Sequence, residues 1–395
     1  MPMISDLEKV YASLFQYCKN QDFAGYDPFD GLNSRIFQAT PFKYLAPARL
    51  AWLQMVKRSA KDLRPLLRVP KGENAKGIAL FALAELSRFR VTGDEENREN
   101  AVTLIERLRK HGITGKAVNG NRKLSFGYNF DWQSRAFYAR KGTPTIVPTA
   151  FAARAFVEAF QLFGEQTYLD EAAAICEFIL NDLNRPVETS SELCFSYSPI
   201  DKSVIFNASL LAGETLAAVG SIARNIEYLK LAKKTAHFVL NKQTENGSWA
   251  YGSKLRHKWV DNFHTAYILL SLGRIDKFTG ENGNLFEINR GFNYWLGNFF
   301  LLDGTPKYFD AETYPIDIHS AAAAIAVLSE MKNLDSRALP QAVKTAEWTV
   351  QNMLDTDGHF YYQVRRSSTV KTPFIRWGQA WMAFALTRLI EASAK

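Results

Sequence analysis

The chain has 395 residues, of which 47% are apolar and 13% aromatic, and its formal net charge is +8. No window of about 18 apolar residues predicts a membrane span. The polar, acidic start MPMISDLEKVYASLF differs from a secretory signal. The cysteines are odd in number and lack the spacing of a metal site or a disulfide framework (Cys18, Cys176, Cys194). These features predict a cytoplasmic protein without a bound metal.

The positive charge suits an anionic partner, such as a uronate-bearing glycan, a nucleotide-sugar or a nucleic acid. A basic solvated surface is the simpler interpretation. No single helix face or run concentrates the basic residues as nucleic-acid binders do, so a nucleic-acid partner is not expected.

Two kinds of helix are expected to alternate along the chain. Amphipathic helices begin near residues 5, 96, 168, 227, 285 and 339, and nearly all-apolar ones near residues 74, 146, 204, 262, 318 and 375. An additional helix is expected over Pro47–Ser59. Because a helix that is apolar all round is buried and one with a single apolar stripe lies outside it, six inner helices within six outer helices are predicted.

This pattern predicts an all-α (α/α)6 toroid that forms a single domain over residues 1–395. An open solenoid is the alternative, but it normally carries polar terminal repeats. The last inner helix instead keeps four large apolar side chains, so closure is favoured (Trp377, Trp381, Met382, Phe384).

Short glycine/aromatic turns recur before the inner helices. Their tyrosines follow one another at intervals of 54, 57 and 54 residues (Tyr197, Tyr251, Tyr308, Tyr362). A recurring period in this range is typical of repeat architectures. Since every outer-to-inner connection of a toroid lies at one end of the ring, the turns are expected to surround one funnel at the N-terminal ends of the inner helices.

Polar side chains begin the inner helices and are therefore expected on the floor of this funnel. The candidate catalytic residues are two aspartates and two histidines (Asp261, Asp317, His264, His319). Candidate substrate-binding residues share this floor or the aromatic rim (Asp131, Trp132, Tyr197, Asn207, Trp249, Tyr251, Tyr308, Tyr362, Arg365, Arg376, Trp377, Gln379). Aromatic walls with a few converging polar groups are typical of a sugar-binding cleft.

Each of these residues also has a structural explanation. Asp261 and Asp317 stand where an N-cap aspartate belongs. His264 and His319 fit buried, hydrogen-bonded core positions, and each rim aromatic fits packing between turns. Arg376 at a helix start is disfavoured by the helix dipole, which indicates an anionic partner.

Motifs for phosphate loops, dinucleotide binding, zinc proteases and serine hydrolases are missing, and no cofactor is expected. The blocks FDWQSRAFYARKGTPTIVPTAF, CFSYSPID, GSWAYG with WVDNFHTAY, and YFDAETYPIDIHSAAAAI resemble a family of bacterial exopolysaccharide and capsule biosynthesis proteins. The resemblance implies a glycan context and supplies no catalytic residues. The predicted toroid is similar to six-hairpin glycosidases, polysaccharide lyases and N-acylglucosamine 2-epimerases, which is an analogy of fold.

Three functions remain open, with an oligosaccharide or polysaccharide as the partner, either anionic or lipid-linked. The first, slightly favoured because this chemistry predominates among toroids of this type, is hydrolysis of a glycosidic bond by paired carboxylates, Asp261 and Asp317. The second is a uronate-directed lyase or C5-epimerase, in which His264, His319 or a tyrosine moves a proton and an arginine holds the carboxylate. The third is a glycan-binding scaffold without catalysis.

Overall fold

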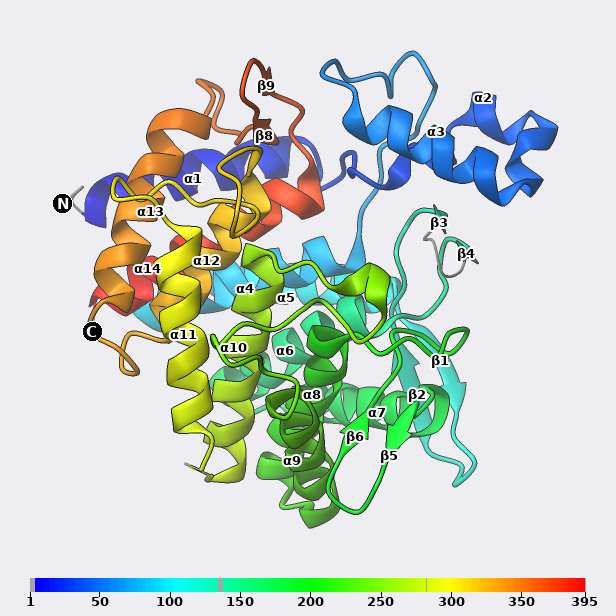
Figure 1. The fold of residues 1–395 in the computed structure, drawn as a ribbon, viewed down its shortest axis with the longest axis vertical. Helices are drawn as coiled ribbons and strands as arrows, with labels where there is room; N and C mark the ends of the chain where they lie inside the picture. Colours follow the sequence, from blue (N-terminus) through cyan, green and yellow to red (C-terminus); the bar gives the residue numbers. More distant parts are fainter. Residues whose placement is uncertain (1–3, 134–137, 282, 395) are drawn as a thin grey trace.

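The computed structural model describes residues 4–133, 138–281 and 283–394. Six inner helices alternate with six outer ones (Figure 1). The inner helices are α4 (Ala75–Thr92), α6 (Ile146–Phe163), α8 (Phe206–Ala223), α10 (Asn262–Thr279), α12 (Ile318–Glu330) and α14 (Ala380–Ala394). The outer helices are α1 (Ile4–Asn20), α5 (Glu95–Lys110), α7 (Gln166–Asp182), α9 (Ile226–Leu240), α11 (Leu285–Phe299) and α13 (Ala338–Met353). Each inner helix packs against the next and α14 packs against α4, which confirms the closed (α/α)6 toroid.

Burial follows the predicted division between the two kinds of helix. On α4 every residue from Ala75 to Ser87 is buried, and on α12 every residue from Ile318 to Ser329. On α5 only four residues on one stripe are buried (Ala101, Leu104, Ile105, Leu108). Small side chains on the inner helices let neighbouring backbones approach, and larger apolar ones fill the ring between them.

The connections differ sharply at the two ends of the ring. Inner helices pass to outer helices through short turns, and α4, α6 and α10 end at glycines with positive φ (Gly93, Gly164, Gly280). A left-handed residue at this position closes a helix with little strain when it is glycine. The long connections all lie at the other end, where the inner helices begin. The candidate catalytic and substrate-binding residues were predicted at that end.

Short strands stabilise the long connections. Three two-stranded sheets form from β1 (Ile113–Lys116) with β2 (Arg122–Ser125), β3 (Trp132–Gln133) with β4 (Tyr138–Ala139), and β5 (Val187–Glu188) with β6 (Leu193–Cys194). A three-stranded sheet has the order β7 (Ile316–Asp317), β8 (Gln363–Val364), β9 (Thr369–Val370), and η3 (Leu255–His257) is a single 3-10 turn. β7 runs directly into α12, so this last sheet holds the start of an inner helix in place.

One predicted helix differs at its start. The last inner helix was expected over Ile375–Ala392, but its first turn is a π-helix, η4 (Ile375–Gln379), that precedes α14. π turns occur mostly as single insertions in α-helices and are frequent at functional sites. Sequence periodicity does not distinguish such a turn from an α-helical one.

An arm projects from the toroid between α1 and α4 (Figure 1, upper right). It comprises residues 26–71, because Gly25 and Gly72 close its base through two backbone hydrogen bonds, each of 3.1 Å. It contains η1 (Asp30–Asn33), α2 (Arg35–Gln38), η2 (Pro41–Tyr44) and α3 (Ala46–Arg58). α3 confirms the additional helix expected over Pro47–Ser59. A small separate core holds the arm together (Leu32, Phe37, Leu53).

Contrary to the expectation that no segment resembles a membrane span, two inner helices among the described residues, α6 and α8, have the length and hydropathy of one. Within the toroid, 78% of the apolar window of α6 and 83% of that of α8 are buried. Their apolar surface is therefore already covered by neighbouring helices.

Candidate functional site

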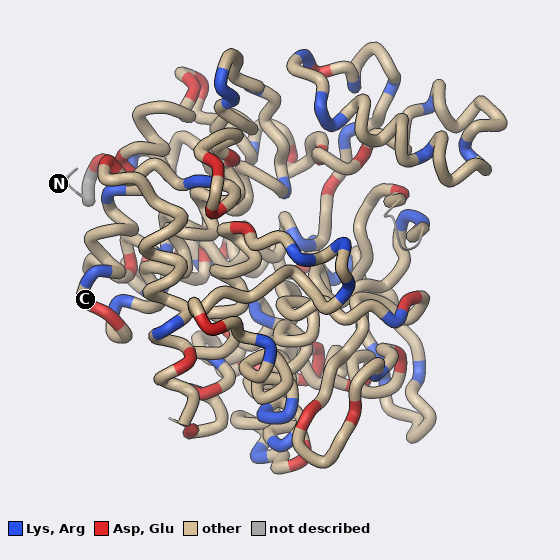
Figure 2. The backbone as a smooth tube through the Cα atoms, in the orientation of Figure 1, with Lys and Arg blue, Asp and Glu red and all other residues tan. Residues whose placement is uncertain are grey.

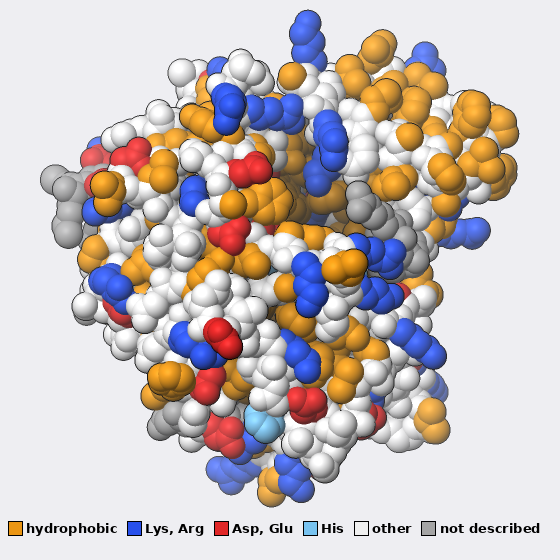
Figure 3. Space-filling view, in the orientation of Figure 1, with side chains coloured by type: hydrophobic (Ala, Val, Ile, Leu, Met, Phe, Trp, Pro, Cys, Tyr) orange, Lys and Arg blue, Asp and Glu red, His pale blue; other side chains and the backbone are white. Residues whose placement is uncertain are grey.

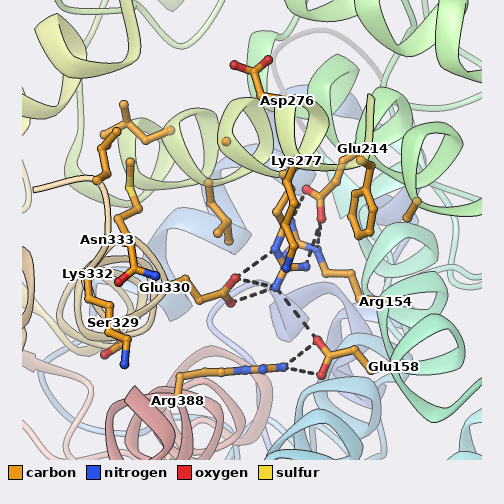
Figure 4. A pocket seen from close by; sticks show the side chains of 18 of the residues that line it. Arg154, Glu158, Glu214, Asp276, Lys277, Ser329, Glu330, Lys332, Asn333 and Arg388 are labelled. Carbon is orange, nitrogen blue, oxygen red and sulfur yellow. Dashed lines mark hydrogen bonds and ion pairs between the residues drawn. The ribbon is translucent and has the colours of Figure 1, made fainter. Parts of the chain in front are cut away.

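The toroid has a cavity of about 710 Å³ at the C-terminal ends of the inner helices (Figure 4). Four arginines and four glutamates, drawn from all six inner helices, line it, and we call them the ionic ring (Arg90, Arg154, Glu158, Glu214, Arg274, Glu330, Arg388, Glu391). Glu158 accepts bonds of 2.6 and 2.7 Å from Arg388, and Arg154 binds both oxygens of Glu214 at 2.7 and 2.6 Å. The arginines come from four of these helices, and those near helix C-termini, such as Arg90 and Arg274, offset the negative ends of the helix dipoles.

The carboxylates of the ionic ring are engaged by these arginines. Each glutamate lies within 3.1 Å of at least one arginine nitrogen. A substrate carboxylate or a catalytic acid placed there would have to displace a buried ion pair, which is costly. The ring therefore fits a structural role in closing the toroid.

A larger cavity of about 1160 Å³ lies at the opposite end, where the inner helices begin. Its walls are α3 of the arm, the segment from Tyr308 to Pro315, and the turn around β8. Four basic side chains line it, against one acidic side chain, Glu312 (Lys57, Arg58, Arg365, Arg366). In Figure 3 a hollow bordered by lysine and arginine side chains separates the arm from the rest of the molecule. This cavity is the candidate site, and it combines aromatic walls with positive charge.

Asp261 and His264 form a dyad at the start of α10. Asp261 caps the helix, because its Oδ1 accepts a 2.9 Å bond from the backbone N–H of His264. Its Oδ2 lies 2.7 Å from Nδ1 of His264 and accepts a 3.1 Å bond from Nε1 of Trp259. Asp261 also bridges to Phe309, a residue of the cavity wall. The two side chains predicted to be catalytic are thus held together, and although neither belongs to the cavity lining, the bridge to Phe309 joins Asp261 to the cavity wall.

The Asp261 carboxylate is only 1% exposed, whereas the His264 side chain is 20% exposed. A carboxylate on Nδ1 fixes the ring and its tautomer, and leaves Nε2 as the reactive nitrogen. Among the described residues, Nε2 of His264 makes no hydrogen bond with protein. The dyad therefore presents one partly exposed nitrogen of defined tautomer.

Asp317 caps α12 and is completely buried. Its Oδ1 accepts bonds of 2.9 Å from the backbone N–H of His319 and 2.8 Å from Nε1 of Trp377, and its Oδ2 accepts one of 2.6 Å from Gln363. Burial raises the pKa of this carboxyl group above its usual value, although the three hydrogen bonds act against that rise. Both oxygens are thus occupied by protein donors.

His319 is also completely buried and forms part of a chain of polar contacts with Tyr267 and Lys76. Its Nδ1 donates to the carbonyl of Trp377 at 2.9 Å, and its Nε2 accepts from the hydroxyl of Tyr267 at 2.6 Å. Burial, assisted by the charge of Lys76, lowers the pKa of His319 well below its usual value. His319 is therefore a neutral ring that orients Tyr267.

Lys76 continues this chain and was not predicted from the sequence. Its Nζ lies 3.4 Å from the hydroxyl of Tyr267 and 4.5 to 5.3 Å from the ring centres of three aromatic side chains (Phe151, Tyr267, Trp381). It makes no ion pair within the described part of the chain, and burial lowers its pKa well below the usual value. The available sequence signal was a lysine followed directly by the apolar stretch Gly77–Ala84.

Arg376, expected to hold an anionic ligand, is paired within the protein. Its Nε and Nη2 donate to the two carboxylate oxygens of Asp27 at 2.6 and 2.9 Å, and both residues are buried. Gln379 is also completely buried, where it accepts from the backbone N–H of Phe360 and donates to its carbonyl. The structure thus gives Arg376 and Gln379 protein partners where substrate contacts were expected.

The predicted aromatic rim is only partly assembled. Tyr308 and Tyr362 line the cavity, as does Arg365. Tyr251 stacks on Trp259 with ring centres 4.7 Å apart. Trp249 does not belong to the rim. It is 1% exposed, and its Nε1 donates to the carbonyl of Val239.

The correction for Trp249 has a simple physical reason: its ring lies directly against Gly291 of α11. The absence of a side chain at that glycine lets the indole enter the core.

The remaining candidate substrate-binding residues lie at the end of the toroid where the inner helices begin. Tyr197 accepts or donates a 3.0 Å bond with Tyr128 and packs on Trp132, and Asp131 accepts from Tyr138 at 2.5 Å.

Asn207 lies near the start of α8 and is 3% exposed. Its side-chain oxygen has no hydrogen-bond partner among the described residues.

Two further residues at the site were not predicted from the sequence. Lys57 reaches the cavity from the arm, and Trp259 contacts the Asp261–His264 dyad. The arm was expected as a helix, but nothing in the sequence indicated that it lies over the inner-helix termini.

Comparison with known proteins shows where this fold recurs. No family model and no curated protein matches the sequence. Among solved structures, cellobiose 2-epimerase from Bacillus thermoamylovorans B4167 is similar with a TM-score of 0.63 and 13% identity, over 82% of this chain and 87% of its own. An unsaturated glucuronyl hydrolase specific for heparin is similar with a TM-score of 0.62 and 12% identity, over 99% of this chain and 97% of its own. A D-mannose isomerase is similar with a TM-score of 0.59 and 15% identity, over 81% of this chain and 87% of its own. At these identities the similarity establishes a shared fold, that of a six-hairpin toroid.

Proposed function

We propose that this protein is a carbohydrate-active enzyme that moves a proton on an acidic sugar, with His264 as the base. The observation that carries this proposal is the 2.7 Å contact between Asp261 and Nδ1 of His264, in a dyad that the Asp261–Phe309 bridge joins to the wall of a cavity with a basic lining. A histidine oriented by a carboxylate is suited to general acid–base catalysis near neutral pH. The names of the fold relatives, an epimerase, an isomerase and a glucuronyl hydrolase, support a sugar substrate.

The cavity lining supports an anionic sugar, such as a uronate. Lys57, Arg365 and Arg366 approach it from two sides, the arm and the β8 turn. Guanidinium and ammonium groups bind carboxylates through charge-assisted hydrogen bonds. Tyr308 supplies aromatic surface on which a pyranose ring can stack, whereas Tyr362, only 2% exposed, supports the wall from behind.

The proposed reaction begins with transfer of the C5 proton of a uronate to Nε2 of His264. The C–H electron pair passes into the substrate carboxylate, whose growing charge the cations of the cavity stabilise. Return of a proton to the opposite face of C5 gives the epimer. Loss of the oxygen substituent at C4, with a proton supplied to that oxygen, gives the unsaturated product. Asp261 stabilises the imidazolium that forms and keeps it oriented.

Hydrolysis by the pair Asp261 and Asp317 has weaker support. A retaining or inverting enzyme needs two carboxyl groups that reach the glycosidic bond from two sides. Asp317 is completely buried and accepts three protein hydrogen bonds, while Asp261 holds its own helix and His264. Both aspartates are better explained as caps that organise the site.

The test is deuterium incorporation from heavy water into uronate oligosaccharides, followed by NMR, together with absorbance of the unsaturated product. Deuterium at C5, or the unsaturated product, is expected with the unmodified protein. His264→Gln should slow either reaction by about 100-fold to 10,000-fold, the usual contribution of a general base. Asp261→Asn should also slow it, because an amide no longer fixes the reactive tautomer.

His237→Gln is the matched control, because His237 is an exposed histidine on α9, an outer helix. It should leave the reaction unchanged. Release of reducing ends without deuterium uptake, abolished by Asp261→Asn, would replace this proposal with hydrolysis. Saturable binding of the glycans with neither reaction would identify a non-catalytic scaffold.

A further inference from the structure

The arm carries a net charge nearly as large as that of the whole protein. Its residues 26–71 include nine lysines and arginines and three aspartates, a net charge of +6 in a chain of +8. Between Asp30 and Asp62 there are six basic residues and no acidic one. Figure 2 shows the arm as a projecting loop with blue segments and few red ones. The charge is spread over many residues, which is why no single run identified it in the sequence.

Two of the three aspartates of the arm do not offset this charge at its surface, and only Asp62 is exposed. Asp27 and Asp30 are each 4% exposed. Asp27 pairs with Arg376 of the toroid, and Asp30 accepts a 2.6 Å bond from Arg64. The outer surface of the arm is therefore more basic than its composition suggests.

The same arm exposes large apolar side chains. We call residues 35–47 the arm tip. Four of its side chains are well exposed: Ile36 by 42%, Phe42 by 56%, Tyr44 by 75% and Leu45 by 55%. Met55 on α3 and Leu66 on the returning segment add exposures of 46% and 74%. In Figure 3 the projecting lobe at upper right is covered mainly by hydrophobic side chains.

We propose that the arm tip docks onto an anionic lipid surface. Exposed aromatic and aliphatic side chains beside basic ones are the composition of segments that lie in a membrane interface. Each basic residue close to an anionic leaflet adds attraction, and the apolar side chains add the area they remove from water. Arg35 and Lys43 stand next to Ile36, Phe42 and Tyr44, so both contributions act at the same place.

Charge complementarity favours a bilayer over a second copy of this chain. Two arms of +6 facing each other would repel, and the chain as a whole carries +8. A phosphatidylglycerol surface instead offers negative charge over a wide area. Between Asp30 and Asp62 the arm has no carboxylate that could form an ion pair with the basic side chains of a second arm.

Docking of the tip would bring the candidate site close to the lipid headgroups. α3 links the two, since Gln54, Lys57 and Arg58 line the cavity while Met55 is exposed. This inference extends the proposed function toward saccharides carried at a membrane surface. Its test does not depend on catalysis, so either proposal can fail without the other.

The experiment is co-sedimentation of the full-length protein with phosphatidylcholine vesicles, with and without phosphatidylglycerol. We expect binding to the anionic vesicles that weakens as sodium chloride is raised. The variant F42S/L45S should weaken binding at least tenfold, because both side chains lose the apolar area that they would remove from water. Circular dichroism would establish that this variant retains its helices.

The matched control is F286S/L302S, which removes a phenylalanine and a leucine that are even more exposed, 71% and 98%, and lie outside the arm. It should bind vesicles like the unmodified protein. Three results would overturn the proposal: no binding to anionic vesicles, equal binding to neutral ones, or an equal effect of both double variants. Sedimentation velocity showing a dimer that F42S/L45S dissociates, without vesicle binding, would assign the arm tip to self-association.

Discussion

Asp27 and Arg376 form a buried, two-point ion pair across 349 residues of sequence. Asp27 lies at the root of the arm, and Arg376 lies in the π turn before α14. The pair thus joins the arm to the last inner helix next to the candidate site. A guanidinium group that was expected to bind an anionic ligand instead holds the protein together.

Asp27→Asn should destabilise the protein by about 3–5 kcal/mol, because it leaves the buried Arg376 guanidinium without a compensating charge. Urea unfolding followed by circular dichroism measures this change. Adding Arg376→Met should recover part of the loss, since the unpaired charge is then removed. Asp335→Asn breaks an exposed pair with Arg337 and should cost about 1 kcal/mol or less. Equal effects of Asp27→Asn and Asp335→Asn would contradict a buried charge pair.

The ionic ring predicts a loss of stability in acid. Burial alone would raise the pKa of Glu158, but Arg388, Arg90 and Arg274 overcome it and lower the pKa from 4.5 to about 2. A carboxyl group with a lowered folded-state pKa stabilises the fold above its unfolded pKa, and this contribution is lost as the pH falls from about 4.5 to about 2. It amounts to roughly 3 kcal/mol.

Thermal unfolding at a series of pH values between 6 and 2 measures this contribution. Glu158→Gln should be less stable at pH 6, and its stability should depend less on pH below about 4.5. Glu95→Gln, at an exposed position on α5, is the control and should follow the unmodified protein. Identical acid profiles for the unmodified protein and Glu158→Gln would show that the ring does not hold this carboxylate ionised.

The toroid could be predicted from the sequence because burial imposes a pattern on each helix. Apolar and small residues all round, as on α12, have one explanation, which is a position inside the ring. The site residues were harder, because a polar residue at a helix start can serve either the helix or a ligand. In the structure, every polar side-chain atom of Asp317 and His319 has a protein partner. Some of these partners lie 46 and 58 positions away in the sequence, so the local pattern does not reveal them.

Two parts of the site had no local sequence signal. Lys57 belongs to the arm, and its approach to Asp317 and Asp27 depends on how the arm folds back over the toroid. Trp249 appeared in the same type of turn as the rim tyrosines, but a glycine on the following outer helix admits it to the core. Such long-range contacts are set by tertiary packing, which periodicity does not encode.

The lowered pKa of Lys57 leads to a prediction for ligand binding. Burial lowers its pKa from 10.5 to about 8, against the opposing influence of Asp317 and Asp27. The affinity for an acidic oligosaccharide should therefore fall as the pH rises from 7 to 9, because the ammonium group is lost. Lys57→Met should weaken binding at pH 7 by about 10-fold to 100-fold, the value of a hydrogen bond to a charged group.

Isothermal titration calorimetry with uronate oligosaccharides measures both effects. Lys57→Arg should keep its affinity at pH 9, because a guanidinium group remains charged. Lys277→Met, in the cavity at the opposite end, is the control and should bind normally. If Lys57→Met binds as well as the unmodified protein, the anionic group of the ligand does not contact the arm.

Two glycines of the inner helices should respond to alanine in opposite ways. At Gly213 of α8 an added Cβ would overlap the hydroxyl of Thr235 on α9, a residue that is itself completely buried. At Gly273 of α10 an added Cβ would meet no atom within 4 Å. Gly213→Ala should lower the free energy of unfolding by about 1–3 kcal/mol, the usual cost of overpacking. Gly273→Ala should raise it by about 0.5–1 kcal/mol, since alanine favours a helix interior.

Urea unfolding of both variants under the same conditions measures the contrast. The double variant Gly213→Ala/Thr235→Ser keeps the overlapping oxygen and should stay destabilised, whereas Gly213→Ala/Thr235→Ala removes it and should recover stability. A loss for Gly213→Ala that Thr235→Ala does not relieve would point to backbone displacement between α8 and α9. Recovery would establish that the close approach of α8 and α9 depends on the glycine. Such close contact between an inner helix and its outer neighbour is needed for the two rings of helices to pack together.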